Sequence, residues 1–239
     1  MTHSAIQVRQ AVILAGGNAT RLRPYTDRVP KALVDVGGKP ILDHQLAWLA
    51  AEGIEHAVVS CGYRADALQR HLLGRTLPLE VTVVVEERRL GRGGGLKHAA
   101  RALPMAAEPW LALNGDVVTR FSLAGLADRH ADSGAAATLG IAALRSPYGI
   151  VDVGPDGRIQ GFDAAPVLPH RVNAGVHLFA PETTALLPDL GDHESVTFPR
   201  LAAQGRLAAY EIDGYWRAID SAKDLQEANR ELKHLEWAA

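Results

Sequence analysis

Three basic side chains follow a pair of glycines near the start of the chain. Residues 11–31 read AVILAGGNATRLRPYTDRVPK, an apolar run that ends at the two glycines and is followed by Arg21, Arg23 and Lys31. Glycines let backbone N–H groups approach an anion closely, and the basic side chains supply positive charge. The segment therefore predicts a phosphate-binding loop. It is not a Walker A loop, because no Gly-Lys-Ser/Thr follows the glycines, and it lacks the G-x-G-x-x-G spacing of dinucleotide-binding folds.

An acidic side chain follows a second apolar run. Asp116 comes directly after WLALNG, residues 110–115. Open α/β sheets bind ligands at the carboxyl ends of their strands, so we expect Asp116 to face a site. Mg²⁺ prefers oxygen ligands and is held by one or two carboxylates together with substrate phosphates, which makes Asp116 the main candidate metal ligand. An aspartate that caps the next helix is the alternative interpretation.

These candidate residues need a parallel sheet to position them. Through the first half of the chain, short apolar runs alternate with helical patterns, as in AVILA before ILDHQLAWLAAEG and HAVVSC before ADALQRHLLG. This alternation is typical of a parallel sheet flanked by helices. We therefore expect an α/β fold with a Rossmann-like mixed, mostly parallel sheet.

The second half of the chain has fewer long helical patterns. GIVDVGPDGRIQGF predicts a hairpin that turns at Asp156-Gly157, and VNAGVHLFA and LAAYEIDGYW each predict one strand. Ser221 and Asp224 form a pattern like a capping box, which predicts the start of a closing helix. These elements are expected to complete the mixed sheet.

Composition narrows the class of protein. The chain has 239 residues, a net charge of −2 and no cluster of basic residues. This length suits one large domain, and this charge argues against a nucleic-acid partner. No apolar run is long enough for a signal peptide or a membrane span, so we expect a cytoplasmic protein without a membrane partner. The single cysteine, Cys61, ends an apolar run and predicts a small buried residue.

The glycine loop resembles a known signature. LAGGNATRLRPYT, followed by Pro30-Lys31 and Lys39-Pro40, resembles the L-A-G-G-x-G-T-R-L-x-P-x-T, P-K and K-P motifs of the sugar-1-phosphate nucleotidyltransferases. Ala19 stands where this family usually has its third glycine. The resemblance implies a reaction in which a sugar-1-phosphate oxygen attacks the α-phosphate of a nucleoside triphosphate and releases pyrophosphate.

The resemblance also implies an architecture. It implies a GT-A-like nucleotidyltransferase fold with one domain over residues 1–239. A nucleotide-binding half is expected over about 9–120, and a sugar-phosphate-binding half over about 121–239.

Individual residues receive roles from the same resemblance. Arg21 matches an arginine that contacts the β- and γ-phosphates, Lys31 matches a lysine that contacts the α-phosphate, and Asp116 falls within a metal-binding motif. Arg23 is equally consistent with a surface ion pair. The positions implied to bind the nucleotide are Leu14, Ala15, Gly16, Gly17, Asn18, Ala19, Thr20, Gly94, Gly95 and Asn114. Those implied to bind the second substrate are Tyr148, Gly149, Asn173 and Gly175, although Asn173 is also a common turn-forming residue.

A second glycine-rich run belongs to the same comparison. LGRGGGLK, residues 90–97, resembles the family segment whose backbone lies against the nucleobase, and a flexible loop is the alternative. Arg92 replaces the usual small polar residue. It is consistent with a contact to a substrate phosphate or acceptor, or with a solvated turn.

Two departures from the family pattern affect the acceptor side. The family commonly has Glu-Lys-Pro after the hairpin, with the lysine on the sugar phosphate, whereas this chain has Ala165 at the lysine position. Relatives usually read Trp-x-Asp-x-Gly near the end, with the aspartate as second metal ligand, whereas Ala218 occupies that position here. Asp220 lies two residues on, about 7 Å along an extended strand, so it replaces the lost ligand only if the backbone shifts. The candidates to replace the lysine are Arg217, Arg171 and Lys97.

The expected activity is Mg²⁺-dependent transfer of a nucleotidyl group to a sugar-1-phosphate or a sugar-like cyclitol phosphate. GTP is the preferred donor, because residues 39–45 (KPILDHQ) and 198–207 look most like mannose-1-phosphate guanylyltransferases. Residues 93–97 also resemble heptose-1-phosphate guanylyltransferases and muramic-acid-type uridylyltransferases. The alternatives are a uridylyl- or thymidylyltransferase of the same family, and a catalytically weak homologue that binds a nucleotide sugar as a regulatory subunit. The expected partners are a nucleoside triphosphate and a sugar-1-phosphate, with homo-oligomerisation left open.

Overall fold

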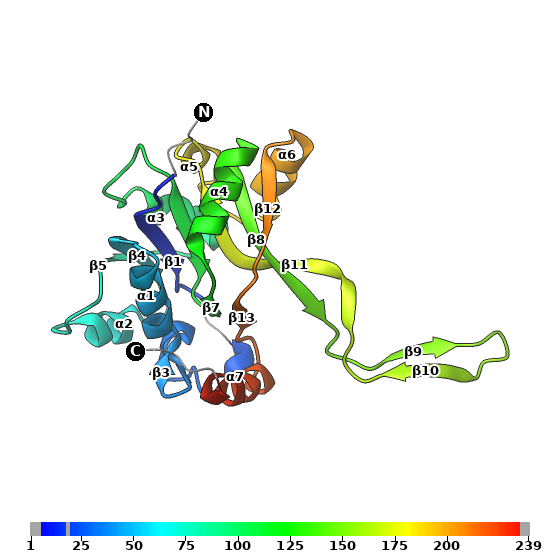
Figure 1. The fold of residues 1–239 in the computed structure, drawn as a ribbon. Helices are drawn as coiled ribbons and strands as arrows, with labels where there is room; N and C mark the ends of the chain where they lie inside the picture. Colours follow the sequence, from blue (N-terminus) through cyan, green and yellow to red (C-terminus); the bar gives the residue numbers. More distant parts are fainter. Residues whose placement is uncertain (1–5, 18–19, 235–239) are drawn as a thin grey trace.

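A seven-stranded sheet forms the centre of the molecule (Figure 1). The computed structural model describes residues 6–17 and 20–234. In spatial order the strands are β12 (Leu207–Glu211), β8 (Ala137–Arg145), β11 (Val167–Phe179), β6 (Trp110–Asn114), β1 (Gln10–Leu14), β4 (His56–Cys61) and β5 (Glu80–Val85). Neighbouring strands are parallel except where β11 runs antiparallel to β6 and β8. The predicted mixed, mostly parallel α/β sheet is confirmed.

Both faces of the sheet are covered by helices. Along β1, Ala11 and Ile13 belong to one buried cluster and Val12 belongs to the other, because successive side chains of a strand point to opposite faces. Strands buried on both faces read as continuous apolar runs, which is why AVIL carries no polar residue. The first face packs against α1 (Ile41–Ala51), α2 (Ala65–Leu72) and α4 (Leu123–Ser133), and the second against α3 (Gly91–Ala100) and α6 (Thr197–Ala203).

The last elements of the chain pack beside β7 and the first loop. LAAYEIDGYW, predicted as one strand, forms two, because the chain leaves β12 at Glu211 and forms β13 (Tyr215–Ala218) against β7 (Val117–Arg120). The closing helix α7 (Ala222–His234) follows, and Ser221 and Asp224 exchange hydrogen bonds as a capping box does. A third apolar cluster joins this region to the first loop and to the short pair β2 (Asp35–Val36) and β3 (Lys39–Pro40).

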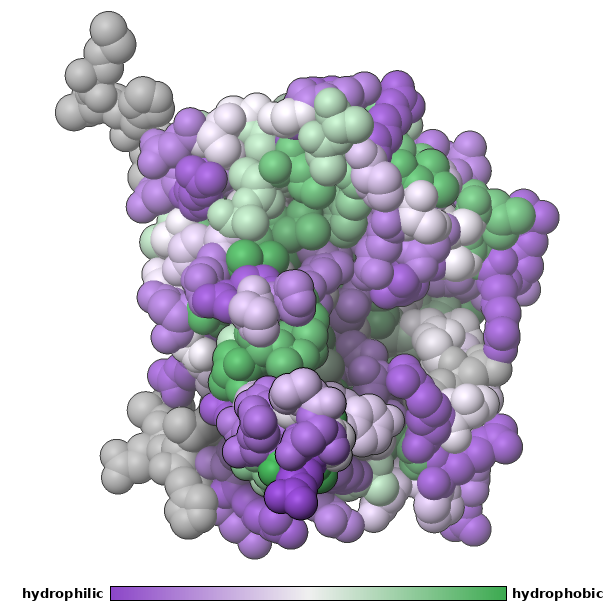
Figure 2. Space-filling view, turned by 90° about the vertical axis from the view of Figure 1, so that its right-hand side faces the viewer, coloured by the Kyte–Doolittle hydropathy of each residue, from purple (hydrophilic) through white to green (hydrophobic). Residues whose placement is uncertain are grey.

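The predicted hairpin is an arm that extends away from the body. It consists of β9 (Ile150–Val153) and β10 (Ile159–Asp163), and Gly157 adopts a φ of 77° in its turn. In Figure 1 the arm projects from the ends of β8 and β11, and Figure 2 views the molecule from the side to which it points. Its cross-strand pairs place Val151, Val153, Ile159 and Phe162 on one face, and each of these side chains is at least 41% exposed.

A smaller expectation, that Cys61 is buried, is met. Cys61 is buried and unpaired, and burial together with the charge of Glu86 raises the pKa of its thiol to about 11. Among residues 6–17 and 20–234, no helix has the length and apolar character required to cross a membrane.

Candidate active site

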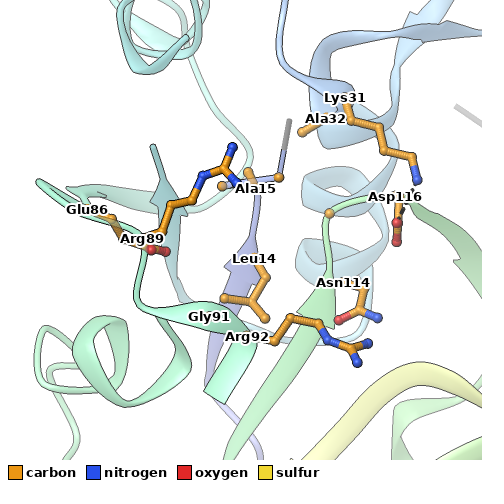
Figure 3. Close-up of a pocket in the computed structure, with 13 residues that line it drawn as sticks. Leu14, Ala15, Lys31, Ala32, Glu86, Arg89, Gly91, Arg92, Asn114 and Asp116 are labelled. Atoms are coloured by element: carbon orange, nitrogen blue, oxygen red, sulfur yellow. Dashed lines mark hydrogen bonds and ion pairs between the residues drawn. The ribbon is translucent and has the colours of Figure 1, made fainter. Parts of the chain in front are cut away.

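Lys31 joins segments that are far apart in the sequence. Its Nζ atom lies 2.8 Å from Asp116 Oδ2 and 2.8 Å from Asp220 Oδ1. Arg21 donates to the same Asp220 oxygen over 3.0 Å. The Lys31 side chain is 14% exposed, whereas that of Arg21 is 76% exposed. Figure 3 shows the Lys31 amine reaching Asp116 at one side of a pocket. The structure thus brings together the four charged residues that the sequence selected.

Strand pairing explains how Asp220 reaches this cluster. Ala218 ends β13 opposite Val117 of β7, and the Ile219 N–H donates to the Asp116 carbonyl over 2.9 Å. The chain leaves the strand at that point, so Asp220 does not continue the alternation of β13. Its carboxylate turns toward Lys31, which opens the short helix η2 (Lys31–Leu33). Position 218 thus carries no aspartate, and the carboxylate of Asp220, two residues later, lies at the cluster.

The charges of the cluster balance closely. Burial alone raises the pKa of Asp220, but the hydrogen bond and charge of Lys31 and the charge of Arg21 outweigh burial and lower it. Two carboxylates and two cations therefore face one another. No group of three or more His, Cys, Asp or Glu side chains suited to a metal occurs within the described part of the chain. The two carboxylates that contact the Lys31 amine, those of Asp116 and Asp220, still match the oxygen ligands that Mg²⁺ prefers. Mg²⁺ takes its remaining oxygen ligands from phosphates and water.

Arg23 has a different environment. Its guanidinium lies 3.5 Å from Asp27, and both side chains are more than half exposed. This is the surface ion pair that was the alternative for this residue.

A pocket of about 320 Å³ extends from the charged cluster (Figure 3). Leu14, Ala15, Gly16 and Gly17 line the pocket, and Asn114 lies beside Leu14 as its partner on the neighbouring strand β6. These are five of the positions predicted to bind the nucleotide. The wall is close-packed: a Cβ added to Gly115 would lie 2.5 Å from the Leu14 carbonyl oxygen, so the neighbouring strand ends require glycine there.

Three further predicted positions follow Gly17 in the sequence. Thr20 opens the short helix η1 (Thr20–Leu22) and is not one of the residues that line the pocket. Asn18 and Ala19 lie outside the described residues.

The far end of the pocket carries side chains that sequence reasoning missed. Glu86 and Arg89 lie on the opposite side from Lys31 and Asp116 in Figure 3. Glu86 Oε1 accepts a hydrogen bond from the Ser60 hydroxyl at 3.0 Å, and its Oε2 accepts one from the Leu90 N–H at 3.3 Å. The signal was present in the sequence, since Glu86 directly follows the strand VTVVV, as Asp116 follows WLALN.

The second glycine run is helical, so the alternative of a flexible loop is wrong. Gly91 to Gly95 form the first turns of α3, and Gly94 and Gly95 are buried rather than part of the pocket wall. A Cβ on Gly94 would lie 2.7 Å from the Asp189 carbonyl oxygen, and one on Gly95 would lie 2.7 Å from Glu86 Oε1. Both glycines therefore permit close packing of the helix start. Among the expected positions in this run, the structure does not bring Gly94 and Gly95 to the pocket surface.

Arg92 is exposed, but its guanidinium has acidic partners. It donates to Asp192 and Glu194, and Glu194 in turn accepts a hydrogen bond of 3.0 Å from the Asn173 amide. The sequence holds no local signal for this network, because its acidic members come about 100 residues later.

The predicted acceptor residues divide into two groups. Asn173 is already engaged, since its Oδ1 accepts from the Gly175 N–H and from the His177 ring. Gly175 has a φ of 68°, and a Cβ there would lie 2.6 Å from the Asn114 amide nitrogen, so these two positions are adjacent. Tyr148, 76% exposed, and Gly149 instead lie at the base of the arm.

The three candidates to replace the missing lysine all have acidic partners. Arg217 pairs with Glu227 and Glu231, Arg171 pairs with Glu211, and Lys97 pairs with Asp189. Of these, Arg217 alone lines a cavity that also contains Asp220.

Comparison with known proteins assigns the family. The model of the family described as nucleotidyl transferase matches residues 10–234. Mannose-1-phosphate guanyltransferase beta-A of Xenopus laevis is 33% identical over 95% of this chain and 67% of its own length. The mannose-1-phosphate guanyltransferase of Yarrowia lipolytica is 35% identical over 90% of this chain and 61% of its own length. This chain therefore spans about two thirds of the length of these relatives.

Solved structures share the fold. HddC from Yersinia pseudotuberculosis, in a complex with GMP-PN, superimposes with a TM-score of 0.73 at 22% identity, covering 94% of this chain and all of that one. At that identity the likeness supports the architecture. Together with the family match over nearly the whole chain, it shows that this chain belongs to the nucleotidyl transferase family.

Proposed function

We propose that this protein transfers a nucleotidyl group from a nucleoside triphosphate to a sugar-1-phosphate, giving a nucleotide sugar and pyrophosphate. The observation that carries this proposal is the meeting of Lys31, Asp116 and Asp220 at one end of a glycine-walled pocket. Both substrates are anions, so the site must neutralise charge and align the two phosphates. The proposed site lies between the two halves of a single domain, about 9–120 and about 121–239.

The chemistry follows from the charged side chains. A sugar phosphate oxygen forms a bond to the α-phosphorus, and the bond to the bridging oxygen of pyrophosphate breaks. Lys31 stabilises the charge that develops on the α-phosphoryl oxygens, and Arg21, which is exposed, reaches the β- and γ-phosphates. No general base is required, because a phosphate monoester is already an anionic nucleophile near neutral pH. Asp220 holds Lys31 and Arg21 in position before substrates bind.

Asp116 and Asp220 are the residues that would hold Mg²⁺. When bound, this ion would neutralise phosphate charge and orient the triphosphate. Both carboxylates contact Lys31, so movement of the Lys31 amine onto a substrate phosphate would release oxygen ligands on the two aspartates. The same exchange would keep the cluster close to neutral.

Guanine is the base that the pocket favours. With the triphosphate at Lys31, the base lies toward Glu86 and Arg89 at the opposite side. A carboxylate accepts hydrogen bonds only, and guanine presents two adjacent donors, N1–H and the exocyclic amino group, whereas uracil and thymine present one. The curated relatives are named guanyltransferases, and a solved neighbour binds GMP-PN, which also supports GTP. Their named acceptor supports mannose 1-phosphate as the first acceptor to assay.

A panel assay tests the proposal. The protein is incubated with each of GTP, UTP, dTTP, ATP and CTP and with a set of sugar-1-phosphates and cyclitol phosphates, and pyrophosphate release is measured. Turnover that requires both substrates is expected, fastest with GTP. Calorimetric binding of nucleotide without turnover of any substrate pair would instead support the regulatory alternative. The alanines at positions 165 and 218 are the reason for that alternative.

We further propose that the chain forms a homo-oligomer and acts in the cytoplasm, where nucleoside triphosphates are made. The apolar face of the arm supports self-association. A two-stranded hairpin is marginally stable by itself, and Val151, Val153, Ile159 and Phe162 are exposed on one side of it. Two copies of that face, related by a twofold axis, would bury each other.

A further inference from the structure

A second cavity, of about 720 Å³, lies between the base of the arm and the end of the chain. Its walls come from β8, from β13 and from α7. Asp220 also lines this cavity, so it opens beside the carboxylate that contacts Lys31. A molecule seated there would have its nearest end at the charged cluster.

Most charged side chains around this cavity already have partners. Arg217 donates to Glu227 and to both oxygens of Glu231. Asp224 accepts the capping hydrogen bonds of Ser221 at the start of α7. These side chains line the cavity, but they already have hydrogen-bond partners within the protein.

Arg145 is different. It lines the same cavity from the last position of β8, and its side chain is exposed and makes no ion pair or hydrogen bond within the described part of the chain. Its charge does reach the cavity, because it helps to lower the pKa of Glu231, although hydrogen bonds from Arg217 and Tyr215 contribute more against the opposing effect of burial.

The strand pairing also places Arg145 beside the position that lacks a cation. Arg145 lies opposite Val167 of β11, and the Ser146 N–H donates to the Pro166 carbonyl over 2.9 Å. Ala165 immediately precedes Pro166. A cation that is absent from position 165 is thus available from the neighbouring strand.

We propose that Arg145 binds the phosphate of the second substrate, a phosphomonoester of a sugar or sugar-like polyol, in the cavity between β8 and β13. The planar guanidinium donates two parallel hydrogen bonds to phosphate, which fixes the orientation of that group as well as its charge. The sugar portion then lies toward Trp216, which also lines the cavity. This inference rests on the proposed nucleotidyl transfer, and it adds the residue that selects and orients the acceptor.

Steady-state kinetics with Arg145→Gln test the inference, with GTP and mannose 1-phosphate as substrates. We expect the KM for mannose 1-phosphate to rise about tenfold or more, as for loss of a charged hydrogen bond, while the KM for GTP changes less than about twofold. Arg145→Lys should recover part of the loss. Arg158→Gln is the matched control, because Arg158 is an exposed arginine near the tip of the arm that pairs with Asp156. An unchanged KM for mannose 1-phosphate in Arg145→Gln would overturn the inference.

Binding measurements separate this inference from the proposed reaction. If the wild type releases no pyrophosphate with any substrate pair, the reaction is wrong, and the inference is judged by calorimetric titration of mannose 1-phosphate alone. Binding to the wild type that is lost in Arg145→Gln supports the inference, whereas equal binding to both proteins, or none to the wild type, contradicts it. Mannose without phosphate should bind both proteins equally. Thermal unfolding of each variant checks that the fold is intact.

Discussion

Lys31 is the side chain on which the proposed chemistry depends most. It is the least exposed cation of the cluster and lies within 2.8 Å of both aspartates. We expect Lys31→Ala to lower kcat about 10²- to 10³-fold, the usual effect of removing one electrostatic donor from a reacting centre. Arg21→Ala should show a similar loss. The rate of pyrophosphate release at saturating substrates measures both, and Arg23→Ala, which breaks only the surface pair with Asp27, is the control. Equal rates in all three variants would remove the loop from the mechanism.

Asp220 permits a sharper test of the metal site. Because its carboxylate contacts both Lys31 and Arg21, Asp220→Asn should raise the Mg²⁺ concentration for half-maximal activity about tenfold or more and should leave Tm nearly unchanged, since the side chain is partly exposed. Asp116→Asn should have at least as large an effect, and EDTA should abolish turnover. Asp27→Asn serves as the matched control because that carboxylate pairs only with Arg23 at the surface. Activity that persists in EDTA would contradict a role for either aspartate in metal binding.

Glu86 gives a test of base selection. Glu86→Gln replaces one acceptor oxygen by an amide donor, so we expect the ratio of kcat/KM for GTP to that for UTP to fall about tenfold or more. The fall should come chiefly from the GTP term. Glu87→Gln, the next residue along and exposed, is the control. A GTP preference that is unchanged in Glu86→Gln would place base recognition elsewhere in the pocket.

The residues proposed to be catalytic were the part of the site most accessible from sequence. Contiguous motifs contain or precede Arg21, Lys31 and Asp116. The prediction that these residues lie together therefore required only that the prediction of a parallel sheet be correct. Arg92 and Arg145 could not be assigned in this way. The place of Arg145 depends on its strand register with a residue more than 20 positions later in the sequence. The partners of Arg92 come about 100 positions later, and the fold of residues 188–196 brings them to it.

At the scale of elements, α3 shows where local sequence signals fail. Glycine disfavours a helix interior by about 1 kcal/mol relative to alanine, which is why a flexible loop was the alternative for the run LGRGGGLK. In the structure the helix begins within this run because Gly93 and Gly94 pack against Pro188 and Asp189, where any Cβ would lie 2.7 Å from a neighbour. Tertiary packing outweighs the local preference, and only the three-dimensional neighbours reveal it.

The segment that packs on α3 also contains a pH-sensitive residue. His193 is fully buried beside His177 and Phe198, and neither of its ring nitrogens has a hydrogen-bond partner among the described residues. Burial lowers its pKa to about 4, with the charge of Asp192 opposing and that of Arg92 adding to the shift. Burial likewise places the pKa of His177 well below its usual value.

We therefore expect the free energy of unfolding to fall as pH drops from about 6.5 to about 4. In that window the unfolded chain binds a proton at His193 that the folded chain does not, so each such group contributes a slope of up to about 1.4 kcal/mol per pH unit. His193→Phe should remove one such contribution and leave that of His177. Urea unfolding at a series of pH values measures the difference. Parallel curves for the two proteins would show that His193 does not titrate in this way.

At the scale of the whole molecule, the body and the arm have different relations to sequence. In the first half, one α-helix lies between each strand of the central sheet and the next such strand along the chain, so the periodicity of the sequence was sufficient to predict the βα alternation. The hairpin was also predicted, from its Asp156-Gly157 turn, but its projection from the body was not. A turn signal fixes how two strands pair, and carries no information on what their exposed face contacts.

That exposed face leads to a prediction for the intact molecule. The double substitution Val153→Thr and Phe162→Thr places a strand-forming residue at both positions. It removes apolar area from the face that we propose joins two copies. We expect the wild type to sediment as an oligomer over a concentration series and the double variant to shift toward monomer. The Tm should change little beyond the loss of association, because in the described residues β9 and β10 pair chiefly with each other. Arg158→Gln, on the same arm, should leave the sedimentation unchanged. A wild type that stays monomeric throughout the series would contradict a role for the arm in self-association.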